Sequence, residues 1–286
     1  LSGKGGDPVI ELQTNFGGGK THSMLALYHL FSGRSPGELQ GSDIILDEFE
    51  EKQLPIARRA VLVGTAISPA QPQTKEDGTV VNTMWGDLAW QLMGKEGYAM
   101  VEQSDKEGVS PGSDILVDLF KRCTSTLILI DEWVAYLRQF HDGQKMSGGT
   151  LESNLSFAQA LTEAAKAVSD TLVVATLPES DIEIGGSHGQ TVLDQLKNVF
   201  GRIESPWRPA SVEESFEIVR RRLFQPLDAD KFTLRDTVVK GFGKLYSDQP
   251  QEFPASCRES EYERRIEHSY PIHPELFDRL YEDWSS

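Results

Sequence analysis

The sequence lacks any long apolar run. Its purely apolar stretches, such as residues 127–130, are far shorter than the roughly 20 residues that a helix needs to cross a bilayer. We therefore expect no membrane association and a cytoplasmic location. No basic segment followed by an apolar one stands near the start, which argues against a secretion signal. Because the chain begins with Leu1 rather than Met, we interpret it as part of a longer protein.

Cysteine is scarce, and histidine is scattered. The two cysteines, Cys123 and Cys257, stand far apart, so a disulfide framework is not expected and a reducing compartment fits better. The six histidines share no metal-ligand spacing, which excludes an obvious histidine metal site.

Positive charge is in deficit. The chain has 28 Lys and Arg against 44 Asp and Glu, a formal net charge of −16. Phosphate backbones are bound by clustered Lys and Arg, so a free-standing nucleic-acid binder is disfavoured. Any contact with DNA is expected to be indirect or to require an assembly.

What the sequence does contain is an alternation of short apolar strands with helices. Strands are expected at residues 8–13, 60–64, 126–130, 171–175 and 202–204. Such alternation predicts right-handed crossovers and a mostly parallel sheet covered on both faces. From residue 211 onward the pattern is helical only. We predict a three-layer α/β core with a five-stranded sheet over residues 1–210, and a small helical lid over residues 211–286.

A glycine loop follows the first expected strand. Residues 14–21 read TNFGGGKT; against the phosphate-loop pattern G-x-x-x-x-G-K-[ST], Gly19, Lys20 and Thr21 match, and Thr14 replaces the first glycine. Such a loop offers backbone N–H groups and a lysine to phosphates, and a hydroxyl to Mg²⁺. Nucleotide contacts are expected from Asn15, Phe16, Gly17, Gly18, Gly19, Lys20, Thr21 and His22. The motif predicts a P-loop NTPase; a plain glycine turn is the alternative, and His22 could instead pack beneath the loop.

The most apolar expected strand ends in two carboxylates. Residues 126–132 read TLILIDE, the pattern of a Walker-B strand. At the carboxyl edge of a parallel sheet, Asp131 would hold Mg²⁺ together with Thr21, and Glu132 would act as general base toward water. The alternative is a strand followed by an acidic helix start.

Two further polar residues suit an ATP site. Thr176 directly follows the fourth expected strand, where a polar side chain can help to place the attacking water. Arg202 could reach the γ-phosphate of a neighbouring subunit as an arginine finger. The alternatives are an ordinary strand-end threonine and a locally paired surface arginine. Asp181 and Glu183 fall in a polar loop after the fourth expected strand. They could face the active site, but we expect them to be exposed in a solvated loop.

Together these features resemble an AAA+ type ATPase of the additional-strand class. More narrowly, the chain resembles the large prokaryotic ATPases of phage-growth-limitation and BREX-type defence systems. The resemblance rests on GGGKTHSMLALYHL at 17–30, LPESDIEIGG at 177–186, IVRRRLF at 218–224 and YPIHPEL at 270–276. It covers nearly the whole chain and implies an ATPase module of a longer protein, with self-association or partners such as a DNA methyltransferase. Thr14 departs from the family pattern, and Arg279 is one candidate for the second sensor arginine in the lid.

The leading hypothesis is therefore an ATPase that uses ATP and Mg²⁺ to drive conformational change in an anti-phage defence complex. Glu132 favours it, because nucleotide binding alone requires no base. A nucleotide-gated switch or scaffold with little turnover is the second hypothesis. A DNA translocase subunit is the third, and the acidic balance counts against it. No N-K-x-D motif of GTPases is visible, so ATP is the expected nucleotide.

Overall fold

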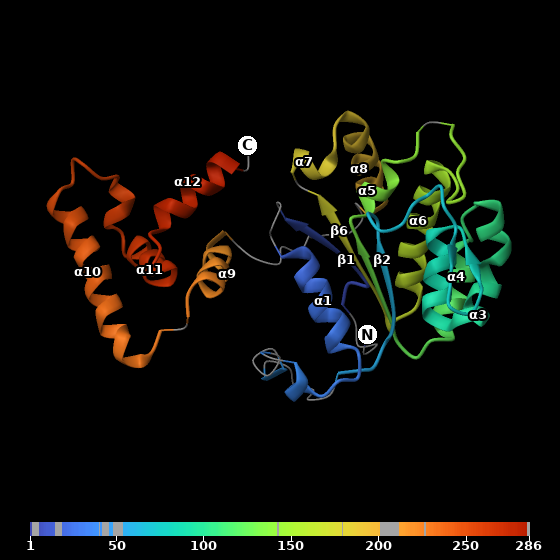
Figure 1. The fold of residues 1–286 in the computed structure, drawn as a ribbon, viewed down its shortest axis with the longest axis horizontal. Coiled ribbons are helices and arrows are strands. Elements are labelled where there is room, and N and C mark those ends of the chain that lie inside the picture. Colours follow the sequence, from blue (N-terminus) through green and yellow to red (C-terminus); the bar gives the residue numbers. More distant parts are fainter. Residues whose placement is uncertain are drawn as a thin grey trace. The chain divides into compact units, whose positions relative to one another are not determined.

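The computed structural model divides the chain into two compact units, Leu1–Pro209 and Ala210–Ser286 (Figure 1). The structure describes residues 1, 6–14, 19–39, 41, 46–47, 54–141, 143–178, 180–200, 212–225 and 227–284. Within these ranges no helix is both long enough and apolar enough to pass through a lipid bilayer.

The first unit alternates strands with helices. Its strands are β1 (Val9–Thr14), β2 (Arg58–Val63), β5 (Thr126–Asp131) and β6 (Thr171–Pro178), with a short hairpin of β3 (Gln73–Thr74) and β4 (Val80–Val81). Its helices are α1 (Lys20–Leu30), α3 (Met84–Glu107), α4 (Ser113–Lys121), α5 (Trp133–Leu137), α6 (Leu151–Ala167), α7 (Asp181–Ile184) and α8 (Ser187–Phe200), with a 3-10 turn η1 (Pro36–Glu38).

The large sheet is parallel throughout, in the order β1-β6-β5-β2. This confirms the predicted α/β class and the mostly parallel sheet. The described sheet has four strands rather than the five expected, and the segment predicted as the fifth, residues 202–204, lies outside the described residues. Because every strand runs the same way, all four carboxyl ends meet at one edge.

Helices cover both faces of this sheet, as Figure 1 shows. The alternation of side chains along a strand sends Ile128 and Ile130 of β5 into a large core with α3, α4, α5, α6 and α8. Leu127 and Leu129 point the other way, into a smaller core with Met24 of α1. The central strand β5 is buried at every residue, because helices cover it above and below and strands pair on both sides.

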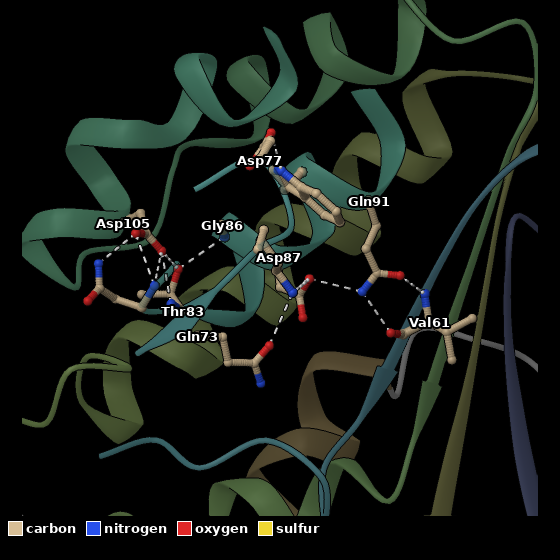
Figure 2. Close-up of polar contacts among 11 residues, drawn as sticks. Val61, Gln73, Asp77, Thr83, Gly86, Asp87, Gln91 and Asp105 are labelled. Atoms are coloured by element: carbon tan, nitrogen blue, oxygen red, sulfur yellow. Dashed lines mark hydrogen bonds and ion pairs between the residues drawn. The ribbon is translucent and has the colours of Figure 1, made fainter. Parts of the chain in front are cut away.

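The Gln91 side chain pairs with the backbone of one residue, Val61, on the outer edge of β2 in the described sheet (Figure 2). The Gln91 amide of α3 accepts from the Val61 N–H at 2.8 Å and donates to the Val61 carbonyl at 2.9 Å, as a neighbouring strand would. The same amide donates to Asp87 at 3.0 Å. This arrangement satisfies edge groups that would otherwise be open to pairing with another chain.

A buried carboxylate ties the β3–β4 hairpin to α3. Asp105 is fully buried and accepts from the backbone N–H groups of Asn82 and Thr83 and from the Thr83 hydroxyl at 2.6 Å (Figure 2). It also accepts from the Tyr98 hydroxyl at 3.0 Å. Burial, reinforced by this carboxylate, raises the pKa of Tyr98, which therefore stays protonated as a donor. Helical geometry in α3 is interrupted at Gly94 (φ 61°, ψ −143°).

The described residues of the second unit form helices and turns only. The helices are α9 (Val212–Leu223), α10 (Phe232–Asp248), α11 (Ser260–Ser269) and α12 (Pro274–Trp284), with 3-10 turns η2 (Ala229–Lys231) and η3 (Ala255–Arg258). Its small core consists of Val239, Tyr246, Tyr262 and Ile266. The Tyr246 hydroxyl lies 2.7 Å from Nε2 of His273, and burial lowers the pKa of that imidazole.

We predict that Asp105→Asn destabilises the first unit by about 2–3 kcal/mol, because an amide cannot accept all the donors that surround the carboxylate. Urea unfolding, followed by the fluorescence of buried Trp85 and Trp133, measures the change. The exposed Asp118→Asn is the control and should stay within about 0.5 kcal/mol. Equal midpoints for the two variants would contradict the role given to Asp105.

Candidate functional site: the carboxyl edge of the parallel sheet

The first turn of α1 carries the lysine and threonine of the predicted phosphate loop. Gly19 precedes it in the left-handed region (φ 82°, ψ 6°), a conformation that favours glycine. As the N-cap residue, Gly19 has no side chain with which to cap the helix, and backbone N–H groups at a helix start are suited to bind an anion. Lys20 and Thr21 follow directly. The remaining predicted loop contacts, Asn15, Phe16, Gly17 and Gly18, lie outside the described residues.

Asp131 is the centre of the hydrogen bonding at this edge. It ends β5, is 8% exposed, and accepts a hydrogen bond at each carboxylate oxygen. The Thr21 hydroxyl of α1 donates to Oδ2 at 2.8 Å, and the Thr176 hydroxyl of β6 donates to Oδ1 at 2.7 Å. Thr176 also accepts from the Glu132 backbone N–H at 2.9 Å. The structure thus brings together four residues singled out from the sequence: Thr21, Asp131, Glu132 and Thr176.

The Thr21–Asp131 pair suits a magnesium ion. A hydroxyl and a carboxylate are the hard oxygen donors that Mg²⁺ prefers. The Thr21 Oγ1 and Asp131 Oδ2 atoms lie 2.8 Å apart in a direct hydrogen bond, so both would be near enough to hold one ion. Among the described residues no group of three or more His, Cys, Asp or Glu side chains forms an alternative metal site.

Glu132 has an unusual backbone conformation. Its φ of 54° and ψ of 40° make it the one non-glycine residue with positive φ in the described part of the chain. Such a conformation costs about 1–2 kcal/mol in an L-residue and is often found at functional sites. Gly64, just after β2, makes room for it: a Cβ at Gly64 would lie 2.1 Å from the Glu132 carbonyl oxygen. The Glu132 carboxylate accepts a hydrogen bond from the Thr65 hydroxyl.

Glu183 is not solvated in the way that the sequence suggested. The segment after β6 forms the short helix α7, and Glu183 points from it toward α1. Its carboxylate pairs with Lys20 Nζ at 3.1 and 3.2 Å, with the side chains only 22% and 12% exposed, respectively. The expectation was wrong because it considered only local sequence, whereas the partner lies 163 positions earlier.

A cavity of about 120 Å³ lies among these groups. It is lined by Lys20, Thr65, Glu132, Val134, Ala135, Arg138, Thr176, Pro178 and Glu183. It is smaller than the roughly 300–1,000 Å³ typical of small-molecule pockets, so it suits a group the size of a phosphate rather than a whole nucleotide. The lining combines two cationic and two anionic side chains.

Other residues singled out from the sequence are placed less centrally or not at all. His22 is exposed on the first turn of α1. Arg202 lies outside the described residues. Conversely, sequence reasoning missed Thr65 and Arg138. Thr65 follows a strand end, the same signal that drew attention to Thr176, whereas no local pattern marks Arg138.

The comparison with known families identifies the first unit. The DUF499 N-terminal domain matches residues 1–205. The chain belongs to the DUF499 family. No curated protein matches it. Every described site residue of this DUF499 chain, from Lys20 to Glu183, falls inside the matched region, so the site belongs to the DUF499 N-terminal domain.

We predict that Gly64→Ala destabilises this DUF499 domain by about 1–3 kcal/mol, because the added methyl group must displace the Glu132 backbone. Gly37 is the matched control, since a Cβ there meets nothing within 4 Å. Chemical denaturation of the two alanine variants measures the difference. A Gly64→Ala protein as stable as Gly37→Ala would show that the close approach to Glu132 does not exist in solution.

Proposed function

We propose that this chain is a P-loop ATPase that hydrolyses ATP with Mg²⁺ at the carboxyl edge of its parallel sheet. The observation that carries the proposal is the direct hydrogen bond between Thr21, in the first turn of α1, and Asp131, at the end of β5. The two residues come from the two motifs that P-loop enzymes use to hold Mg²⁺. Their pairing across 110 positions is independent support for reading both motifs as one site.

Lys20 and the start of α1 supply the positive potential for phosphate binding. The ammonium group belongs to the first residue of the helix, where the backbone N–H groups and the helix dipole also attract anions. Thr21 and Asp131 would hold Mg²⁺, which neutralises charge on the β- and γ-phosphates when bound. Thr176 keeps Asp131 in place through its hydrogen bond to Oδ1.

Glu132 is the residue best suited to act on water. Its carboxylate lines the cavity, and it directly follows Asp131 in the chain. As general base it would accept a proton from the water that attacks the γ-phosphorus. Thr65 orients this carboxylate by donating a hydrogen bond to it. A binding module would need neither the carboxylate nor the backbone strain at Glu132.

The resemblance to AAA+ ATPases of phage-growth-limitation and BREX-type systems extends the proposal. In this view the second unit acts as a lid, Arg202 acts as a finger in a self-associated form, and the chain works in the cytoplasm within a defence complex. Hydrolysis would then drive conformational change in that complex, and DNA would be contacted only through the assembly.

Glu132→Gln is predicted to lower the rate of ATP hydrolysis by about 10²–10⁴-fold while MgATP still binds, because the amide keeps the shape but cannot accept a proton. Lys20→Ala is predicted to abolish binding and turnover together. Steady-state phosphate release and equilibrium binding of MgATP measure the two effects, with and without double-stranded DNA. Undiminished turnover in Glu132→Gln would refute the role of Glu132.

The same measurements separate the alternatives. Tight MgATP binding by the unaltered chain with negligible phosphate release would favour the nucleotide-gated switch. Hydrolysis that depends on DNA would favour the translocase. Failure of the unaltered chain to bind nucleotide would refute the ATP site itself.

A further inference from the structure

The Lys20–Glu183 ion pair puts a carboxylate where the proposed function requires a phosphate. Both oxygens of Glu183 lie within 3.2 Å of Lys20 Nζ, and both side chains are mostly shielded from water. An ion pair at this depth is screened much less than one on the surface. Phosphate oxygens would therefore have to replace the Glu183 carboxylate to reach the lysine.

Glu183 is held in this position by the helix that follows the Walker-B strand. Arg138, just after α5, donates from Nη1 to the Glu183 carbonyl at 2.9 Å and to the Ile184 carbonyl at 3.0 Å. The next residue, Gly185, has a backbone conformation that favours glycine. Gly185 has a φ of 77°, and a Cβ there would lie 2.0 Å from the same Nη1 atom. The carboxylate is thus positioned by a defined backbone contact rather than by a loose surface segment.

The charges of the cavity make Glu183 a competitor of an anionic ligand. Glu132 and Glu183 already bring two carboxylates to the cavity, opposite Lys20 and Arg138. A phosphate entering this cavity meets repulsion from Glu183 for as long as that side chain remains beside Lys20. Gly185 and Gly186 both have positive φ directly after α7, so the backbone can change direction there.

We propose that Glu183 is a built-in counter-ion of Lys20 that competes with nucleotide phosphates and leaves the lysine when they bind. The inference rests on the proposed nucleotide site and adds a regulatory element to it. In the nucleotide-free state the ion pair compensates the lysine and holds α7 against α1. With nucleotide bound, the Glu183 side chain is released, so the state of α7 reports whether the phosphate site is filled.

The test compares Glu183→Gln with the unaltered chain in two measurements. In calorimetric titrations with MgATP we expect Glu183→Gln to bind about tenfold more tightly, because the competing charge is gone. In nucleotide-free protein, acetylation of Lys20 by acetic anhydride, read by mass spectrometry, should be faster in the variant. Glu183→Ala should behave like Glu183→Gln in both measurements, which guards against an effect peculiar to the amide.

Glu102→Gln is the matched control, since it removes a carboxylate from the exposed Glu102–Lys106 pair in the same unit. It should leave MgATP affinity and Lys20 labelling unchanged. Lys20→Ala serves as the reference for loss of the phosphate site.

The outcomes separate this inference from the proposed function. If Glu183→Gln binds MgATP no more tightly than the unaltered chain, while Lys20→Ala loses binding, the inference is overturned and the nucleotide site stands. Unchanged Lys20 labelling in Glu183→Gln overturns the ion pair whatever the nucleotide result. If neither the unaltered chain nor Glu183→Gln binds nucleotide, the proposed function fails and the inference fails with it. Binding by Glu183→Gln alone would support both.

Discussion

The buried carboxylate of Asp131 is the constraint on which the rest of the site depends. A carboxylate shielded from water at the end of the central strand is tolerable only if donors surround it. Thr21 and Thr176 supply those donors, one from α1 and one from β6. Their hydrogen bonds fix the first turn of α1 against the sheet, and Lys20 is carried into place because it precedes Thr21 in that turn.

The position of Glu132 follows from the same strand end by a different route. Consecutive residues of a strand point to opposite faces, so continued β geometry would carry Glu132 away from Asp131. The left-handed conformation of Glu132 ends the strand instead and begins α5. Gly64 on the neighbouring chain segment permits the turn, and Thr65 orients the carboxylate. The carboxylates of Asp131 and Glu132 therefore both lie at the carboxyl edge of the sheet. Asp131 accepts hydrogen bonds from Thr21 and Thr176, and Glu132 accepts one from Thr65.

The local sequence predicted the strands and the two motifs, because both depend on residues that are close together in the chain. Apolar runs revealed all four strands of the described sheet, and the Gly19–Thr21 triplet and the Asp131–Glu132 pair pointed to its carboxyl edge. It missed what depends on the approach of distant segments. Nothing near Glu183 indicates Lys20, and nothing near Arg138 indicates α7. The fifth predicted strand and Arg202 lie outside the described residues, so those two predictions stay open.

The ion pair at Lys20 also follows from how the site is built. Lys20 at the start of α1 is partly buried, and a shielded ammonium is stable only beside an anion. The helix start adds positive potential at the same point, which makes the need for an anion greater. Without a ligand, the protein has to supply that anion itself, and Glu183 is placed to do so. In the phosphate site that we propose, Glu183 therefore competes with the ligand for Lys20.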